Sequence, residues 1–146
     1  MGKSESFTSA LLQATAAALK TSAKDKREAL RNAVLNVAAG TGPDEDTQSL
    51  FLALVDALTP VHLRLLRIIK EGRTVPIGDA PDWLKGNHSH QAIRELLDRG
   101  LVESTNMATR EFLLTGQDGI YKFNVKISHS GEEFIRFLTA PGALSD

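Results

Sequence analysis

Cysteine is absent from the 146-residue sequence. Its absence excludes disulfide bridges, thiolate nucleophiles, iron–sulfur clusters and zinc sites built on cysteine ligands. An excess of charge is missing as well, because 17 lysine and arginine residues oppose 18 aspartate and glutamate residues, for a net charge of −1. The composition therefore lacks the strongly cationic balance that by itself indicates a nucleic-acid or membrane ligand.

Long apolar runs are also missing, and no stretch approaches the roughly 20 residues that a membrane-spanning helix needs. Residues 1–20 include a glutamate and many small or polar residues, and they lack the uninterrupted apolar core of a secretory signal peptide. Together with the missing cysteine, this predicts a soluble, cytoplasmic protein. The length allows one domain, or a small domain with a helical extension, and an apolar content of 42% is enough for an ordered core.

Residues 7–39 contain no glycine or proline and are rich in helix-forming residues, so one long helix is predicted there. Its apolar stripe advances by three or four residues, or by sums of these steps, through Leu12, Ala16, Leu19, Ala23, Leu30, Val34 and Val37. The one gap in the stripe falls at Lys26–Arg27, which indicates a solvated or a kinked stretch of the helix. Gly40, Gly42 and Pro43 end this helix. A second helix is predicted over residues 44–58, with acidic residues in its first turn, where the helix dipole favours negative charge.

A helix of about 30 residues, rising roughly 1.5 Å per residue, is too long to be covered by a module of about 80 residues. We therefore expect its alanine-rich stripe to pack against the same helix of another subunit, which would make the protein a homo-oligomer. The alternative is that the helix folds back over the rest of its own chain. The sequence leaves both arrangements open.

The second half of the chain alternates short helices and extended segments. Helices are predicted over residues 61–71, 82–85, 88–99 and 131–139, and extended segments over residues 73–77, 101–103, 111–115 and 120–128. The last two extended segments form a hairpin around the turn at 116–119, and Ser130 with Glu133 forms a capping box for the last helix. The predicted fold is α+β and mostly α, with a helical region over residues 1–58, a domain with a small antiparallel sheet over residues 59–140, and a loose tail over residues 141–146.

This order of elements resembles a winged helix-turn-helix module over roughly residues 59–139. Two phrases carry the resemblance: Ile93-Arg-Glu-Leu-Leu-Asp-Arg-Gly-Leu-Val102 and Ile127-Ser-His-Ser-Gly-Glu-Glu-Phe134. They are similar to the end of the recognition helix and to the return from the wing in bacterial winged-helix regulators of the multiple-antibiotic-resistance type. The stretch from Phe51 to Arg67 also resembles uncharacterised bacterial proteins, some of them linked by name to phage-abortive systems. That second resemblance implies no particular chemistry.

The sequence departs from a typical DNA-reading winged helix in two ways. The helix before the recognition helix is very short, and the recognition helix presents a mixed face of Gln91, Arg94, Glu95 and Asp98. The two carboxylates on that face would repel phosphates. Residues 60–146 also carry equal numbers of basic and acidic side chains, so this module is neutral, whereas DNA affinity rests largely on neutralising phosphates.

The resemblance implies that duplex DNA is a candidate partner. A helix laid in the major groove needs exposed donors near its N-terminal end, where glutamine and arginine side chains can pair with base edges. The candidates on the recognition helix are His88, Ser89, Gln91 and Arg94, and those on the wing are Arg110, Lys122 and Lys126. The alternative interpretation is a solvated helix face and an edge strand protected by lysine. A protein partner, with no nucleic-acid binding, is the second hypothesis.

No arrangement of residues predicts an enzyme. Gly40 and Gly42 lack the spacing and the lysine of a phosphate-binding loop, and no nucleophile motif frames a serine. His88 and His90 are two residues apart, so on a helix they do not face the same side, as metal ligands would. We therefore expect a binding protein without catalytic residues, metal site or cofactor.

Overall fold

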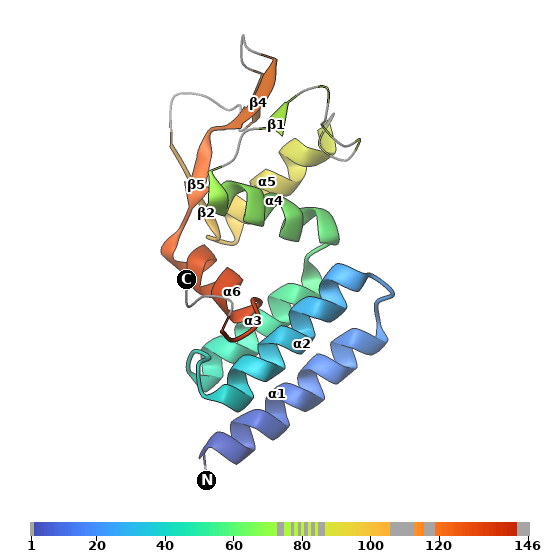
Figure 1. The fold of residues 1–146 in the computed structure, drawn as a ribbon, viewed down its shortest axis with the longest axis vertical. Helices are drawn as coiled ribbons and strands as arrows, with labels where there is room; N and C mark the ends of the chain where they lie inside the picture. Colours follow the sequence, from blue (N-terminus) through green and yellow to red (C-terminus); the bar gives the residue numbers. More distant parts are fainter. Residues whose placement is uncertain are drawn as a thin grey trace. The chain divides into compact units, whose positions relative to one another are not determined.

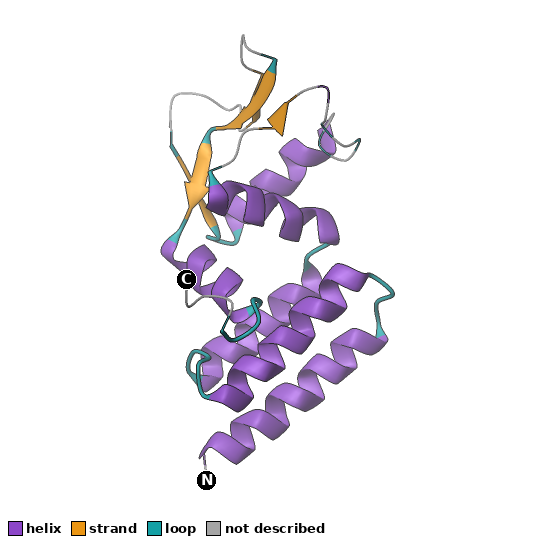
Figure 2. Ribbon diagram, in the orientation of Figure 1, coloured by secondary structure: helices purple, strands orange, loops and turns teal. Residues whose placement is uncertain are grey.

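The structure is a computed structural model that describes residues 2–72, 75–76, 78, 80, 82, 84, 87–105, 113–115 and 119–142. Within these ranges it holds six α-helices, and the second half of the chain adds small antiparallel sheets (Figure 2). The predicted α+β, mostly helical fold class is therefore confirmed. The chain divides into two compact units, which we call the helical unit (Met1–Pro60 with Glu133–Asp146) and the mixed unit (Val61–Glu132).

The helical unit is built from α1 (Gly2–Leu19), α2 (Lys24–Ala39), α3 (Glu45–Ala57) and the end of α6 (His129–Phe137) (Figure 1). The single helix predicted over residues 7–39 is wrong, because the chain turns back between α1 and α2. Thr21 stabilises this turn by accepting a hydrogen bond from the backbone N–H of Ala23 at 3.1 Å. A hydroxyl that bonds to nearby backbone groups competes with helix formation, so the helix ends here without glycine or proline.

The turn changes which side chains of α1 are buried. Ala10, Ala14 and Ala17 lie in the interior, whereas Leu12 and Leu19, which belong to the predicted stripe, are 67% and 84% exposed. Small alanine side chains let α1 approach α2 and α3 closely within the same chain. The predicted stripe is therefore correct for the buried Leu30 and Val37 of α2 but wrong for α1. Pairing of α1 between subunits stays a prediction.

Aromatic packing joins α6 to α3 within the helical unit. The ring of Phe51 lies 5.2 Å from that of Phe134 in an edge-to-face arrangement and 5.9 Å from that of Phe137. Asn36 of α2 is buried, and its side-chain amide donates to the carbonyls of Phe137 and Thr139 at 2.8 Å each. These carbonyls lie at the C-terminal end of α6, where the backbone lacks partners inside the helix.

The mixed unit contains α4 (Pro60–Glu71, apart from its first residue) and α5 (Asn87–Asp98). Its strands are β1 (Val75–Pro76), β2 (Val102–Ser104), β3 (Leu113–Thr115), β4 (Ile120–Phe123) and β5 (Val125–Ile127). One antiparallel sheet has the order β1-β4-β3, and β2 pairs with β5 in a second. The apolar faces of the two helices supply much of the core, because Leu65 and Leu66 of α4 and Ile93 and Leu96 of α5 are all fully buried.

The predicted hairpin is confirmed by the register of β3 and β4, in which Leu113 is opposite Phe123 and Thr115 is opposite Tyr121. The short β1 lies at the edge of the same sheet, as expected for a segment that contains proline. Of the short helix predicted over residues 82–85, the structure describes only Asp82 and Leu84, both in turns.

The last helix begins at His129, two residues earlier than predicted. The predicted cap at Ser130 is wrong, because the hydroxyl of Ser128 accepts the hydrogen bond from the backbone N–H of Gly131 at 2.9 Å. A Cβ atom at Gly131 would lie 2.1 Å from the carbonyl oxygen of Leu101. This close approach requires glycine, and it fixes where the chain enters α6.

Candidate nucleic-acid interface

The helix predicted to meet DNA, α5, is held by its buried face and by a defined C-terminal end. Ile93 and Leu96 point inward, and Gly100 has a φ of 73°. The backbone N–H of Leu101 bonds to the carbonyl of Leu96 at 3.0 Å, and that of Gly100 bonds to the carbonyl of Leu97 at 3.0 Å. This is a Schellman ending with glycine in the left-handed conformation, and it sets which side of α5 faces outward.

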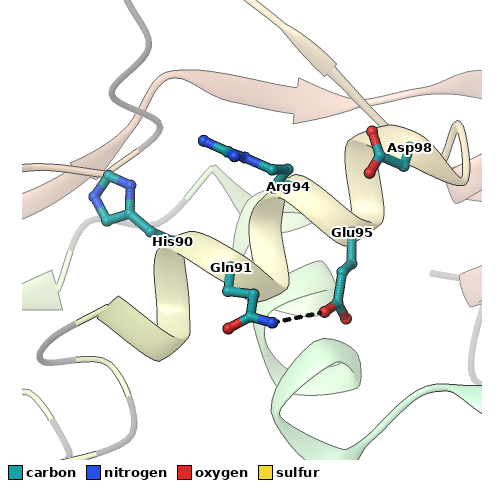
Figure 3. Close-up of a pocket in the computed structure, with 5 residues that line it drawn as sticks. All are labelled: His90, Gln91, Arg94, Glu95 and Asp98. Carbon is teal, nitrogen blue, oxygen red and sulfur yellow. Dashed lines mark hydrogen bonds between the residues drawn. The ribbon is translucent and has the colours of Figure 1, made fainter.

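The outward side of α5 carries polar side chains at every turn. His88, Gln91, Arg94 and Asp98 are exposed, at spacings of three and four residues that place them along one side of the helix. An open hollow of about 620 Å³ lies over this part of α5, and its described lining runs from His90 to Asp98 (Figure 3). The amide of Gln91 and the guanidinium of Arg94 are donors that can pair with base edges.

Glu95 is turned away from Arg94, although the two residues are adjacent in sequence. Figure 3 shows the Glu95 side chain pointing toward Gln91 and away from the Arg94 guanidinium, although both residues line the same hollow. The Gln91 amide donates to Glu95 Oε1 at 3.5 Å, and His62 Nε2 lies 2.5 Å from Glu95 Oε2. The Glu95 carboxylate is therefore engaged within the protein.

His62 comes from α4 and is buried, with 7% of its surface exposed. No sequence pattern indicates its pairing with Glu95. The two residues are 33 positions apart, and neither belongs to a motif that would link them. Only the packing of α4 against α5 brings them together.

Ser89 must be removed from the predicted DNA contacts. Its side chain is fully buried, and its hydroxyl donates to the carbonyl of Leu84 at 2.9 Å. On a helix, residue 89 lies one position from His88 and therefore faces about 100° away from it. This rotation turns Ser89 into the core while His88 stays at the surface.

The predicted wing residues differ in their surroundings. Lys122 on β4 is exposed, opposite Leu114 in the register of the hairpin. Lys126 on β5 is exposed too, but its ammonium group lies 3.8 Å from a carboxylate oxygen of Glu103 on the paired strand β2. Arg110 lies outside the described residues. Lys122 is thus the wing cation with no carboxylate beside it among the residues that the structure describes.

Among the described residues, no group of three or more histidine and carboxylate side chains is placed to hold a metal ion. No single described helix is long and apolar enough to cross a membrane, and α3 and α4 reach the required length and composition only when taken together as a bent pair. No protein-family model, curated protein or solved structure matches the chain.

Proposed function

We propose that residues 59–139 form a winged helix-turn-helix module that binds duplex DNA through the exposed side of α5. The order of elements supports the proposal, since α4, β1, α5, β2 and the hairpin of β3 and β4 follow one another as in the resemblance described above. The protein would act by binding rather than by catalysis.

The observation that carries the proposal is the different placement of Arg94 and Glu95. Arg94 is exposed, and none of the described residues forms a hydrogen bond or an ion pair with it. Glu95, the nearest carboxylate in sequence, contacts His62 and Gln91, and its side chain points away from the Arg94 guanidinium. The Glu95 carboxylate, one of the two expected to repel phosphates, is therefore partly neutralised by partners within the protein, although it lines the same hollow as Arg94 and Asp98.

Lys122 supplies a second cationic contact on the wing. Each phosphate that a lysine or arginine neutralises releases counterions, so the affinity must fall as salt rises. The ion pair of Lys126 with Glu103 is exposed at both ends, with side-chain exposures of 66% and 57%, and such pairs contribute about 0–1 kcal/mol. Lys126 can therefore leave Glu103 and bind a phosphate, but it contributes less binding free energy than Lys122, which has no ion pair to break among the described residues.

The test is a fluorescence-anisotropy titration of mixed-sequence duplex DNA at several salt concentrations. Arg94→Ala should weaken binding by about 5- to 150-fold, which corresponds to about 1–3 kcal/mol. Lys122→Ala should lower the slope of log affinity against log salt by about 1. Arg67→Ala, which removes an exposed cation from α4 in the same unit, is the matched control and should change little. A lack of binding at low salt, or equal losses for Arg94→Ala and Arg67→Ala, would reject the proposal.

A further inference from the structure

An apolar groove of about 250 Å³ lies between α1 and α2 in the helical unit, where the two helices run side by side (Figure 1). Leu11, Ala14 and Ala18 line it from α1, and Leu30 and Val34 line it from α2. We call this feature the α1–α2 groove. Most of its lining is apolar, and it opens to solvent rather than into the core.

Large apolar side chains at the mouth of the groove are not covered by the chain itself. Leu11 is 43% exposed, and Leu35, which lines the groove from α2, is 44% exposed. The segment Phe7–Leu19 of α1 contains no ionisable residue, so the α1 edge is apolar or neutral. A contiguous apolar surface of this kind, bordered by polar groups, is typical of a protein-binding site.

The charged side chains that line the groove are basic and lie on one of its two helices. Its only charged lining residues in the described part of the chain are Arg27 and Arg31, both exposed and both on α2. The Arg27 guanidinium contacts the carbonyl of Ser22 at 3.4 Å, and no described residue bonds to Arg31. No carboxylate of the described residues is recorded as a partner of either arginine.

The dimensions of the groove match a short helix. From Leu11 to Ala18 is seven residues, which at 1.5 Å per residue is about 10 Å, or two helical turns. Amphipathic helices that dock in apolar grooves present side chains at positions i, i+3 or i+4, and i+7, which cover that length. Guanidinium groups at one edge would pair with carboxylates on the flank of such a helix.

We propose that the α1–α2 groove binds an amphipathic helical segment of another protein. Apolar side chains of that segment fill the groove, and acidic side chains on its flank meet Arg27 and Arg31. A second copy of this chain is a poorer occupant, because two-fold pairing of the same groove supplies no described carboxylate to Arg27 and Arg31. This proposal is independent of DNA binding by the mixed unit.

The test uses two helix-forming peptides of about 14 residues. Both carry leucine at positions i, i+3, i+4 and i+7, with flanking glutamate in the first and lysine in the second. The full-length protein should bind the glutamate peptide at least tenfold more tightly, which corresponds to about 1.4 kcal/mol. Binding is measured by fluorescence anisotropy, and amide chemical shifts should map it to α1 and α2.

Reversing the charge of the two arginines tests directly whether they select the acidic peptide. Arg27→Glu combined with Arg31→Glu should invert the preference, so that the lysine peptide binds more tightly than the glutamate peptide. Both arginines are exposed, and thermal melts should show that the variant stays folded. An unchanged preference for the glutamate peptide in this variant, or no saturable binding of that peptide to the wild type, overturns the proposal.

Apolar contacts are tested with a matched pair of exposed leucines. Leu35→Ser should lower the affinity for the glutamate peptide by at least about tenfold, as expected when a buried anchor residue is removed. Leu50→Ser on α3, where the leucine is 59% exposed and does not line the groove, should leave binding unchanged. Equal losses of affinity in the two variants would show that the peptide does not bind in the α1–α2 groove. A wild-type dimer in sedimentation that Leu35→Ser converts to a monomer would identify a second copy as the occupant and reject the proposal.

Discussion

His62 Nε2 lies 2.5 Å from Glu95 Oε2, and this contact joins α4 to α5 at the helix that we propose to meet DNA. The histidine is buried, whereas 44% of the glutamate side chain is exposed. A buried ring nitrogen without a partner is costly, so the contact holds the Glu95 side chain toward α4. It therefore both stabilises the mixed unit and determines where the Glu95 carboxylate lies.

Replacement of Glu95 tests this stabilising role. Glu95→Ala leaves the buried His62 nitrogen without its carboxylate, and we expect the free energy of unfolding to fall by about 1–2 kcal/mol. Urea denaturation at pH 7 measures the change. Asp98→Ala removes an exposed carboxylate from the same helix and should stay within about 0.5 kcal/mol of the wild type. Losses of the same size in both variants would show that the His62 contact adds nothing.

Gly131→Ala tests whether helix propensity or packing dominates the stability at the start of α6. In an unobstructed helix this change would add about 1 kcal/mol of stability. Here the new methyl group would stand 2.1 Å from the Leu101 carbonyl oxygen, so the backbone must move and the protein should lose about 2–4 kcal/mol. Gly42→Ala is the control, because its nearest neighbour, a ring carbon of Phe137, is 3.4 Å away. Thermal melts that show Gly131→Ala to be stabilising would contradict this packing.

Asn36→Leu keeps the approximate size of the side chain but removes its donors. The buried carbonyls of Phe137 and Thr139 would then lose their hydrogen bonds at the end of α6. We expect a loss of about 2–3 kcal/mol in urea denaturation, since unpaired buried polar groups carry the full cost of desolvation. Gln13→Ala breaks an exposed hydrogen bond to the carbonyl of Ser49 and should have a much smaller effect. A loss confined to about 0.5 kcal/mol for Asn36→Leu would mean that water replaces the amide.

A pH-dependent contribution is expected at the start of α3. The hydroxyl of Thr47 donates a hydrogen bond to the Asp44 carboxylate and holds the pKa of Asp44 below its ordinary value of 3.8. The unfolded chain therefore binds this proton more readily than the folded one, so the contribution is present above pH 3.8 and is lost as the pH falls through the folded-state pKa. Thr47→Val should raise the pKa of Asp44 in a carboxyl NMR titration. Its pKa should stay unchanged in Thr41→Val, whose hydroxyl bonds to Asn36 instead.

Local patterns predicted the type of most elements. Apolar periodicity and glycine stops located α3, α4 and α5, and the alternation of the last extended segment placed Lys122 and Lys126 at the surface. His88, Gln91 and Arg94 were candidates because of their place near the start of the recognition helix that the resemblance implies, and all three are exposed. Ser89 is not, because its burial depends on the carbonyl of Leu84, a contact that the spacing of polar residues does not reveal.

The sequence by itself determined the mostly helical α+β class, the hairpin and the polar side of α5, because these depend on periodicity and turn residues within a few positions. Only the tertiary structure decided that residues 7–39 form two helices, and that Ser128 rather than Ser130 caps α6. It also decided that Glu95 turns toward His62. Each of these depends on groups brought together from distant parts of the chain or on competing local hydrogen bonds. Helix propensity alone does not predict such features. In α1, for example, tertiary burial of the alanine face outweighs the small free-energy cost of ending a helix early.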